Sequence, residues 1–365
     1  MRVLFDTSAL TTSMAGISFY TKGLMNGLRS LPEKPEVFDS AYTPKFSRNS
    51  KLRVIDTLIR ENIWYDTTLI YQAKALNVDL IHCPAFFFPK SGCRKLVVTI
   101  HDLYTMRQPA HFNRWHRYTI NKQIINAIDQ RVNIIVPTAF VKNELLEIFP
   151  ASNPALVHVI HSGIPDRPSP VAGSAIQALV LKKHRLANAF LLSVSTIEPR
   201  KNFMALLDAF ALIKEKTTQD LVLVGQVGWK SRGIGEKIDK LGLKNRVHFL
   251  GYISDEDLGV LYSTATAFIF PSLYEGFGFT PLEAMHMGCA VAASNVSCMP
   301  EVLGGAALYF SPVDIEDMAD KMLLLCTDPG LARDYAARSR MQASLYNWRN
   351  AAAQTFSLYS EIVRS

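Results

Sequence analysis

The sequence has no hydrophobic run long enough to cross a bilayer, which takes roughly 18 or more consecutive apolar residues. It begins with the strand-like segment RVLFDTSA and shows no basic and then apolar leader. We therefore expect neither a spanning helix nor a signal peptide. The expectation that follows is a cytoplasmic protein whose contact with the inner face of a membrane, if any, is peripheral.

Cysteine is scarce, and its spacing lacks the CxxC pairs that bind zinc or form a redox centre. The five cysteines are Cys83, Cys93, Cys289, Cys298 and Cys326. An odd and scattered set favours buried reduced thiols over a disulfide framework. This again indicates a cytoplasmic protein.

Motifs for metal ions and for nicotinamide cofactors are also missing. There is no HExxH, no paired Cys and His set, and no acidic doublet placed where a metal would be needed. The glycine-rich segment GQVGWKSRGIG, residues 225–235, lacks the GxGxxG spacing of a dinucleotide-binding turn. We therefore predict a reaction that uses neither a metal nor a cofactor.

Acidic residues are relatively few in the first half of the chain. The net charge is +7, and residues 1–170 hold 20 Lys and Arg against 13 Asp and Glu, whereas residues 171–365 hold 19 of each kind. One interpretation is a basic face with aromatic edges, next to an anionic membrane or a phosphate-bearing acceptor. The other is an ordinary solvated helix face. The residues concerned are Arg48, Lys51, Arg53, Arg60, Trp64 and Tyr65. Nucleic acid is not an expected partner, because the charge is not clustered with stacking aromatics in a known module.

The sequence is rich in apolar runs of strand length that alternate with helical patterns. Six such runs occur in each half, from RVLFD to VHVIHSG and from AFLLSVS to AALYFSP. Phe203, Leu206, Leu207, Phe210 and Ile213 form one apolar helical stripe. Strands that are apolar throughout predict parallel sheets covered on both faces. With 365 residues and 48% hydrophobic content, we expect an α/β protein with two doubly wound domains.

Prolines and small residues interrupt this pattern near the middle of the chain, at Pro165, Pro168, Pro170, Gly173 and Ser174. We interpret the stretch as a linker and divide the chain into residues 1–168, residues 169–345 and a final helical segment, residues 346–365. In open parallel sheets, ligands bind beyond the carboxyl ends of the strands, and each polar motif below follows such a strand. We therefore expect the ligand to lie between the two domains.

The most informative segment is EGFGFTPLE, residues 275–283. Gly276 and Gly278 let the backbone approach a ligand closely. Thr280 and Pro281 are expected to start a helix whose N–H groups face an anion.

The two glutamates of this segment, Glu275 and Glu283, can accept hydroxyl protons from the same ligand. An anion joined to a polyol indicates a sugar nucleotide. For Glu283 alone a capping box with Thr280 as the N-cap is the alternative, because helix starts of that kind need no ligand.

Three further motifs carry candidate residues. SVSTIEPRKNF, residues 193–203, places Arg200 and Lys201 where a diphosphate would need positive charge, which would stabilise a leaving nucleoside diphosphate. His101 and Asp102 follow a strand and can contact a sugar or a phosphate, although a local turn bond is the alternative. Gly16, a single glycine before a helical pattern, can admit a phosphate.

Together these motifs resemble the retaining family 4 glycosyltransferases (GT4), which have the GT-B fold of two Rossmann-like domains facing across a cleft. EGFGFTPLEAM is similar to their E-x7-E signature, and STIEPRKN to their Glu-Pro-Arg-Lys-Asn segment. SCMPEVLGGAALYFSP, residues 297–312, and RVHFLGYISDEDLGVLYSTA also match that family's pattern. The likeness spans most of the second half and is thinner in the first.

The resemblance implies a role for each domain and each site residue. Residues 1–168 would bind the acceptor, residues 169–345 the nucleotide sugar, and residues 346–365 would return to the N-terminal domain. Arg200 and Lys201 would bind the donor diphosphate, Glu275 would lie near the hydroxyls of the transferred sugar, and His101 would face that sugar. Donor-binding positions would be Gly16, Ser195, Tyr252, Gly276, Phe277, Gly278, Phe279, Thr280 and Glu283, with Glu283 on the ribose. The chain departs from the family at Ser195, where members often have Gly, and at Ala15-Gly16, where they have two glycines.

The activity implied is transfer of a hexose from a nucleoside diphosphate sugar to a saccharide acceptor, expected to be lipid-linked, in surface polysaccharide biosynthesis. UDP-glucose is placed narrowly ahead of GDP-mannose as donor. The resemblance implies retention of anomeric configuration without a metal, in which the departing phosphate accepts the proton of the acceptor and no protein base is needed. The alternatives are a sugar-nucleotide epimerase on the same fold and a non-catalytic protein that binds sugar nucleotides.

Overall fold

The computed structural model describes the chain except for residues 13–15, 47–51, 93–94, 165–174, 188 and 227–232. Its residues cluster into two compact units: Met1–Gly163 with Tyr346–Ser365, and Ile164–Leu345. We call them unit 1 and unit 2 and describe each by itself. The linker predicted from Pro165 to Ser174 lies outside the described residues.

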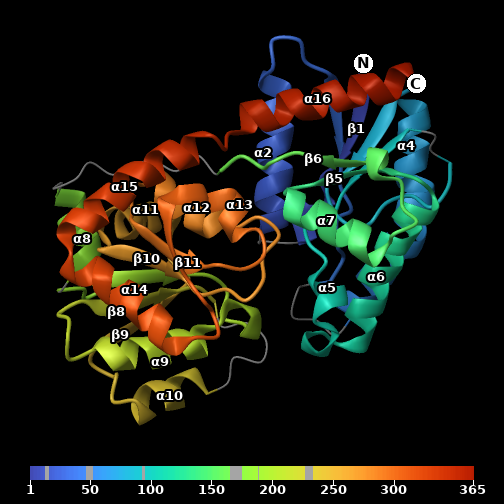
Figure 1. Cartoon of the computed structure of the whole chain (residues 1–365). Helices are drawn as coiled ribbons and strands as arrows, with labels where there is room; N and C mark the ends of the chain where they lie inside the picture. The colour runs from blue at the N-terminus through green and yellow to red at the C-terminus, as the bar shows by residue number, and fades with distance from the viewer. Residues whose placement is uncertain (13–15, 47–51, 93–94, 165–174, 188, 227–232) are drawn as a thin grey trace. The chain divides into compact units, whose positions relative to one another are not determined.

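Unit 1 is built on a parallel six-stranded sheet in the order β2-β1-β3-β4-β5-β6, flanked by helices (Figure 1). Leu4 of β1 lies opposite Phe38 of β2 and Ile81 of β3. The strands are β1 (Arg2–Asp6), β2 (Glu36–Ser40), β3 (Leu80–Cys83), β4 (Leu96–Thr99), β5 (Asn133–Val136) and β6 (Val157–Val159). The α-helices are α1 (Ser8–Thr12), α2 (Gly16–Ser30), α3 (Arg53–Ile59), α4 (Ile70–Ala75), α5 (Tyr104–Arg107), α6 (Arg114–Asp129), α7 (Ala139–Ile148) and α16 (Trp348–Arg364). A π-helix, η1 (Arg60–Leu69), joins α3 to α4, and η2 (Pro109–His111) and η3 (Pro154–Leu156) are 3-10 turns.

Unit 2 has a second parallel sheet in the order β12-β11-β10-β7-β8-β9. Its strands are β7 (Phe190–Val194), β8 (Asp220–Val224), β9 (Val247–Gly251), β10 (Ala267–Phe270), β11 (Val291–Ser294) and β12 (Ala307–Phe310). Its α-helices are α8 (Ala175–Lys183), α9 (Phe203–Ile213), α10 (Ile234–Lys240), α11 (Asp255–Thr264), α12 (Phe279–His286), α13 (Met299–Leu303), α14 (Ile315–Thr327) and α15 (Pro329–Ser344). The 3-10 turns are η4 (Pro199–Lys201) and η5 (Gly304–Ala306).

The architecture confirms the predicted α/β class with two doubly wound sheets. The twelve predicted apolar runs all form strands, and most strand residues are buried because helices cover the sheets. The predicted stripe on α9 is buried along its whole length, from Phe203 to Ile213. None of the helices within the described ranges combines the length and the apolarity that a bilayer span requires.

The last helix, α16, belongs to unit 1 and packs along α2 (Figure 1). Its first residue, Trp348, packs directly against the backbone of two glycines. A Cβ on Gly23 would lie 2.0 Å from the Trp348 ring, and one on Gly163 would lie 2.4 Å from the backbone nitrogen of Trp348. Further along the helix, the Tyr359 hydroxyl bonds to Nδ1 of the buried His82. The helix therefore completes the core of unit 1.

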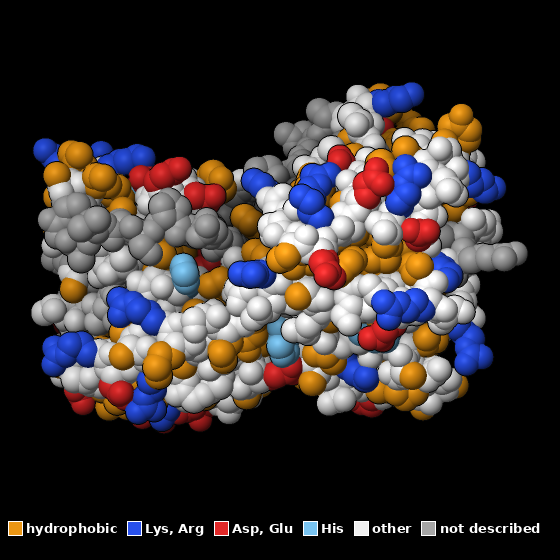
Figure 2. Space-filling view, turned by 90° about the horizontal axis from the view of Figure 1, so that it is seen from above, with side chains coloured by type: hydrophobic (Ala, Val, Ile, Leu, Met, Phe, Trp, Pro, Cys, Tyr) orange, Lys and Arg blue, Asp and Glu red, His pale blue; other side chains and the backbone are white. Residues whose placement is uncertain are grey.

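The predicted aromatic edges of a basic face are wrong. Trp64 and Tyr65 are only 8% and 2% exposed, because η1 turns both rings into the core, where they pack edge to face 5.0 Å apart. Arg48 and Lys51 lie outside the described residues, and Arg60 is largely buried. On the face shown in Figure 2, basic side chains are interspersed with acidic and apolar ones.

No cysteine within the described residues takes part in a disulfide. Cys83, Cys289 and Cys298 are buried and Cys326 is half-buried, whereas Cys93 lies outside the described residues. Burial raises the pKa of Cys289 to about 12 and that of Cys326 to about 11. These thiols are therefore protonated core side chains at neutral pH.

Candidate active site

The sheet of unit 2 reverses its strand order between β7 and β10. From β7 the chain proceeds outward to β8 and β9, and it then returns to add β10, β11 and β12 on the other side. Ala267 of β10 pairs with Leu191 of β7, so these two strands are direct neighbours. In open α/β sheets, ligands bind beyond the carboxyl ends of the strands at such a reversal. The segments that leave β7 and β10 here are residues 195–202 and 271–278, which contain the two main motifs found in the sequence.

The segment after β7 is fixed to β8 before it turns. The Ser195 N–H donates to the carbonyl of Val224 at 3.0 Å. One 3-10 turn follows, and Asn202 then adopts a left-handed conformation with φ +57° before α9 begins. Asn tolerates that conformation better than most residues. The short turn therefore holds Arg200 and Lys201 at the carboxyl edge of the sheet, instead of on the helix that follows.

The segment after β10 turns at Gly278, which has φ +94° and caps the N-terminus of α12. Any side chain there would be strained, and a Cβ would also lie 2.5 Å from Cε of Met299. The carbonyl of Arg200 accepts the Leu273 N–H at 2.8 Å, which ties this segment to the one that leaves β7. The two motifs therefore form one connected site.

The predicted helix start at Thr280 is wrong by one residue. Helix α12 begins at Phe279 with Gly278 as its N-cap, so Thr280 already lies within the helix and does not serve as the N-cap. The capping box considered for Glu283 is therefore also wrong. Gly278 produces the shift, because a left-handed glycine can begin the helix earlier than a threonine cap would.

Glu275 is the centre of the site. The residue is 7% exposed, and its carboxylate accepts from Arg200 Nη1 at 3.0 Å, from Lys201 Nζ at 2.5 Å and from the Ser272 hydroxyl at 2.6 Å. Arg200 also donates from Nε to Glu198 at 2.9 Å. Two carboxylates and two cations from the segments after β7 and β10 are thus joined by short charge-assisted hydrogen bonds.

Burial and charge act in opposite directions on these groups. Burial alone would raise the pKa of Glu275, but Arg200 and Lys201 together hold it below its usual value. Burial, with the neighbouring Arg200 charge, lowers the pKa of Lys201, although Glu275 opposes that shift. Glu275 is therefore ionised at neutral pH and depends on both cations for its stability.

The same edge of the sheet offers main-chain donors. In the first turn of α12 the N–H groups of Phe279 and Thr280 have no acceptor within the helix, and Pro281 carries no N–H. An anionic group placed there would be favoured by the helix dipole and could draw Arg200 and Lys201 from Glu275. The arrangement suits a diphosphate that competes with a resident carboxylate.

Glu283, the second glutamate of the motif, is 4% exposed on α12. Its Oε2 accepts from the hydroxyl of the buried Tyr262 of α11 at 3.2 Å. This hydrogen bond holds the Glu283 side chain of α12 against α11, within unit 2. The contact with a ribose stays a prediction.

The other predicted donor-binding residues of unit 2 lie around the same sheet edge with different exposure. Gly276 and Phe277 are buried, and the rings of Phe277 and Phe279 pack edge to face 5.1 Å apart. Ser195 is half-buried, whereas Tyr252 follows β9 and is 68% exposed. Their roles in binding a donor stay predictions.

Reasoning from sequence missed three residues that hold Glu275 and Arg200. Ser272 donates to the Glu275 carboxylate, and the Ser297 hydroxyl accepts the Glu275 N–H at 3.1 Å. Glu198 accepts from Arg200. Ser297 has φ +54°, a conformation that is rare for serine and has no signature in the sequence. Glu198 lies inside the EPRKN motif, so its place beside Arg200 in the sequence is a signal that could have identified it.

Two predicted site residues lie in unit 1. His101 follows β4, and its Nε2 lies 2.9 Å from the carbonyl oxygen of Pro84 while its ring packs edge to face against Tyr20 at 4.8 Å. Burial lowers the pKa of His101, so the ring is neutral at pH 7. Gly16 is the first residue of α2. Their predicted contacts with a donor held by unit 2 stay predictions.

Within the described residues, no three His, Cys, Asp or Glu side chains are grouped as metal ligands would be. The metal-free reaction remains a prediction that chemistry has to test.

Comparison with known proteins gives matches along both units. The family described as Glycosyltransferase Family 4 matches residues 14–167, and the family described as Glycosyl transferases group 1 matches residues 181–342. O-antigen chain mannosyltransferase B of Escherichia coli is 30% identical over 98% of this chain and 99% of its own length.

Solved structures agree in fold at lower identity. Sucrose-phosphate synthase from Thermosynechococcus elongatus has a TM-score of 0.74 at 21% identity, with 99% of each chain covered. The Anabaena protein HepE, crystallised with UDP-glucose, has a TM-score of 0.75 at 18% identity and covers 99% of this chain and 100% of its own. The two Rossmann-like units therefore have the GT-B fold of these structures, and the two family matches make the protein a glycosyltransferase. The chain belongs to glycosyltransferase family 4.

Proposed function

We propose that this protein transfers a hexose from a nucleoside diphosphate sugar to a saccharide acceptor in the biosynthesis of a surface polysaccharide. The observation that carries the proposal is the buried Glu275 carboxylate between Arg200 and Lys201, beside the N-terminus of α12. A diphosphate needs cations and main-chain donors, and a sugar needs a carboxylate that accepts its hydroxyl protons. This site holds all three at one sheet edge.

The chemistry that this arrangement supports is stabilisation of a leaving diphosphate. As the bond to the sugar breaks, negative charge grows on the phosphate oxygens, and Arg200 and Lys201 bind that charge more strongly than they bind the ground state. Glu275, released in part from its cations, is then available to the hydroxyls of the transferred sugar. We propose retention of configuration without a metal, with the leaving phosphate as proton acceptor and His101 in contact with the sugar.

For the donor we rank GDP-mannose ahead of UDP-glucose. This reverses the narrow preference drawn from the sequence, because a relative that matches almost the whole chain at 30% identity is named a mannosyltransferase. HepE was crystallised with UDP-glucose, but at 18% identity it supports only the fold. We propose a saccharide acceptor, lipid-linked and reached from the cytoplasmic side, because the same relative is named for the O-antigen chain.

The test is a panel of GDP, UDP, GDP-mannose and UDP-glucose, measured as shifts in the thermal midpoint of the purified full chain. A true ligand stabilises the folded state by an amount that grows with the logarithm of its concentration above the Kd, and this is about 2.7 kcal/mol at one hundred times the Kd. NMR of donor and acceptor together would then identify the product and its anomeric configuration. Lys201→Met should reduce transfer by about a hundredfold or more, as does the loss of a group that stabilises developing charge in other enzymes.

Two outcomes would overturn the proposal. If none of the four nucleotides shifts the midpoint, and Lys201→Met is indistinguishable from the parent protein, the site does not bind a nucleotide sugar. If NMR of the donor alone shows an isomerised sugar that stays attached to the nucleotide, the protein is an epimerase.

A further inference from the structure

One face of the unit 1 sheet carries buried polar side chains next to His101. Because side chains alternate along a strand, Thr99, the last residue of β4, and His101, two positions later, are directed to the same face. His82 of the neighbouring strand β3 is opposite Val97 in register, which places it on that face as well. Thr99 and His82 are fully buried, so their polar atoms need partners within the protein.

These partners form one continuous buried network, made of Tyr359, His82, Thr99 and Tyr20. The Tyr359 hydroxyl of α16 bonds to Nδ1 of His82, and Nε2 of His82 lies 2.9 Å from Thr99 Oγ1. The same oxygen lies 3.1 Å from the hydroxyl of the buried Tyr20 on α2. Burial raises the pKa of Tyr20 and Tyr359 and lowers the pKa of His82, so the network is uncharged at pH 7. Its hydroxyls and its one ring N–H supply a donor for each bond, so the network is satisfied without a ligand.

The Tyr20 ring packs against His101. The two ring centres are 4.8 Å apart with their planes at 83°, and Trp348 of α16 packs on Tyr20 at 5.8 Å. Phe86 also lies edge to face with the His101 ring, at 6.4 Å. Nε2 of His101 donates to the Pro84 carbonyl at 2.9 Å, because a carbonyl oxygen can only accept. A rotation of the His101 ring would break this bond and displace its aromatic neighbours.

The protonation of His101 follows from these contacts. Burial lowers the pKa of the ring, so it carries a single hydrogen at pH 7, and the bond to Pro84 assigns that hydrogen to Nε2. Nδ1 therefore keeps its lone pair. In the part of the chain that the structure describes, no residue hydrogen-bonds to Nδ1. This atom can accept a hydrogen bond from a hydroxyl group but cannot donate one.

We propose that Tyr20 is a positioning residue for the proposed transfer, because it holds His101 in the orientation and tautomer in which Nδ1 accepts from a hydroxyl of the sugar. Thr99, His82 and Tyr359 act one step further back, since they fix the hydroxyl of Tyr20. The inference rests on the proposed function, in which His101 contacts the transferred sugar. A network that served stability alone would leave the His101 ring unchanged when it is broken.

The first experiment observes the His101 ring by NMR of the full chain with isotope-labelled histidine nitrogens. Protonated and unprotonated ring nitrogens have well-separated shifts, and the spectrum of His101→Gln identifies the signals. We expect a single tautomer with the hydrogen on Nε2 in the parent protein, and a second tautomer in Tyr20→Leu, which removes the packing ring.

A pair of variants at Thr99 separates positioning from stability. Thr99→Val keeps the volume of the side chain but removes the hydroxyl that joins His82 to Tyr20, so the second tautomer of His101 should appear. Thr99→Ser keeps the hydroxyl and should retain the single tautomer, although it loses a buried methyl group and is therefore expected to be less stable.

The second experiment measures transfer with the donor that the nucleotide panel identifies. A misplacement of about 1 Å at a reacting centre can lower the rate about a hundredfold, so Tyr20→Leu should lower kcat by about ten- to a hundredfold. The KM for the nucleotide sugar should change by less than about threefold, because the contact acts in the transition state. Tyr20→Phe, which keeps the ring, should lower kcat less.

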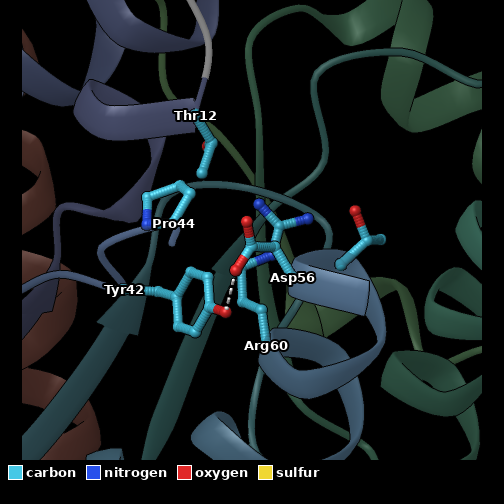
Figure 3. A pocket seen from close by; sticks show the side chains of 6 residues that line it. Thr12, Tyr42, Pro44, Asp56 and Arg60 are labelled. Carbon is cyan, nitrogen blue, oxygen red and sulfur yellow. Dashed lines mark hydrogen bonds between the residues drawn. The ribbon is translucent and has the colours of Figure 1, made fainter. Parts of the chain in front are cut away.

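The matched control is Tyr42→Phe. Tyr42 is a buried tyrosine of the same unit, and its hydroxyl donates to the Asp56 carboxylate at 2.9 Å instead of to the network (Figure 3). Its loss should leave the His101 signals unchanged.

The outcomes distinguish this inference from the proposed function. A hydrogen on Nδ1 in the parent protein would overturn the inference, and so would His101 signals in Tyr20→Leu and Thr99→Val that equal those of Tyr42→Phe. Transfer by the parent protein together with such unchanged signals would leave the function standing. If the signals respond as expected but no nucleotide sugar binds or reacts, the positioning of His101 is upheld and the function is refuted. If Tyr20→Leu does not fold, the Thr99 pair decides.

Discussion

Replacing Glu275 by glutamine separates the stability of the charged site from its affinity for nucleotide. The substitution keeps the size of the side chain and leaves Arg200 and Lys201 without their shared anion. Breaking a buried ion pair in this way costs about 3–5 kcal/mol, and we expect the lower end because an amide oxygen still accepts one hydrogen bond. In a unit of this size 1 kcal/mol shifts the thermal midpoint by about 2–4 °C, so about 3 kcal/mol predicts a decrease of roughly 6–12 °C.

The same variant should respond more strongly to a diphosphate than the parent protein does. In the parent protein a diphosphate competes with Glu275 for the two cations, whereas in Glu275→Gln it supplies the missing negative charge. At one hundred times the Kd a ligand contributes about 2.7 kcal/mol, and tenfold tighter binding adds about 1.4 kcal/mol. Calorimetric unfolding with and without GDP and UDP measures both quantities, while transfer activity should fall.

The control for this experiment is Asp208→Asn. Asp208 pairs with Lys237 at 2.6 Å, but its side chain is 37% exposed, and such pairs contribute at most about 1 kcal/mol. A midpoint for Glu275→Gln that equals the control would refute the account of a buried ion cluster. A smaller nucleotide response than that of the parent protein would refute the competition between carboxylate and diphosphate.

Three further predictions concern the fold and the helix start. Burial lowers the pKa of His82 to about 3. The stability that its neutral ring provides is therefore present above its unfolded pKa near 6.5 and decreases as the pH falls toward 3, by up to about 1.4 kcal/mol per pH unit. Urea unfolding at pH 7 and pH 4.5 should show a smaller loss of stability between these pH values in His82→Gln than in the parent protein. Gly23→Ala places a Cβ 2.0 Å from the ring of Trp348 and should destabilise the docking of α16 by about 1–3 kcal/mol, visible as faster hydrogen exchange in that helix; unchanged exchange would contradict the packing. Gly278→Ala puts a Cβ at a position with φ +94° and in contact with Met299, so it should lower the free energy of unfolding by at least about 1–2 kcal/mol and weaken nucleotide binding measured by calorimetry. An unchanged Kd would mean that the start of α12 does not contact the ligand.

The sheets could be predicted from sequence because a strand covered on both faces is apolar throughout. Phe268 and Ile269, for example, are fully buried in β10, and a short run of such residues leaves few other structures open. The positions of Glu275, Arg200 and Lys201 after their strands followed from the same pattern. Their direct hydrogen bonds could not be predicted, because the residues are about 75 positions apart and meet only through the pairing of β7 with β10.

The errors have local physical causes. One of the two interpretations of the basic segment placed Trp64 and Tyr65 at the edges of an exposed face, but the π-helix η1 turns both side chains into the core. Thr280 is a good N-cap by composition, and only the backbone angle of Gly278 shows that the helix starts earlier.

The discontinuity of unit 1 has a consequence for biosynthesis. Residues 1–163 are synthesised before residues 164–345, but Tyr359, which bonds to His82 in the core of unit 1, and Trp348, which fills the space left by Gly23 and Gly163, are synthesised after them. We expect unit 2, which is contiguous, to complete its fold during translation as soon as residue 345 has emerged, whereas residues 1–163 wait for α16. A nascent polypeptide from which residues up to 345 have emerged should thus expose residues 1–163, but not residues 164–345, to proteolysis.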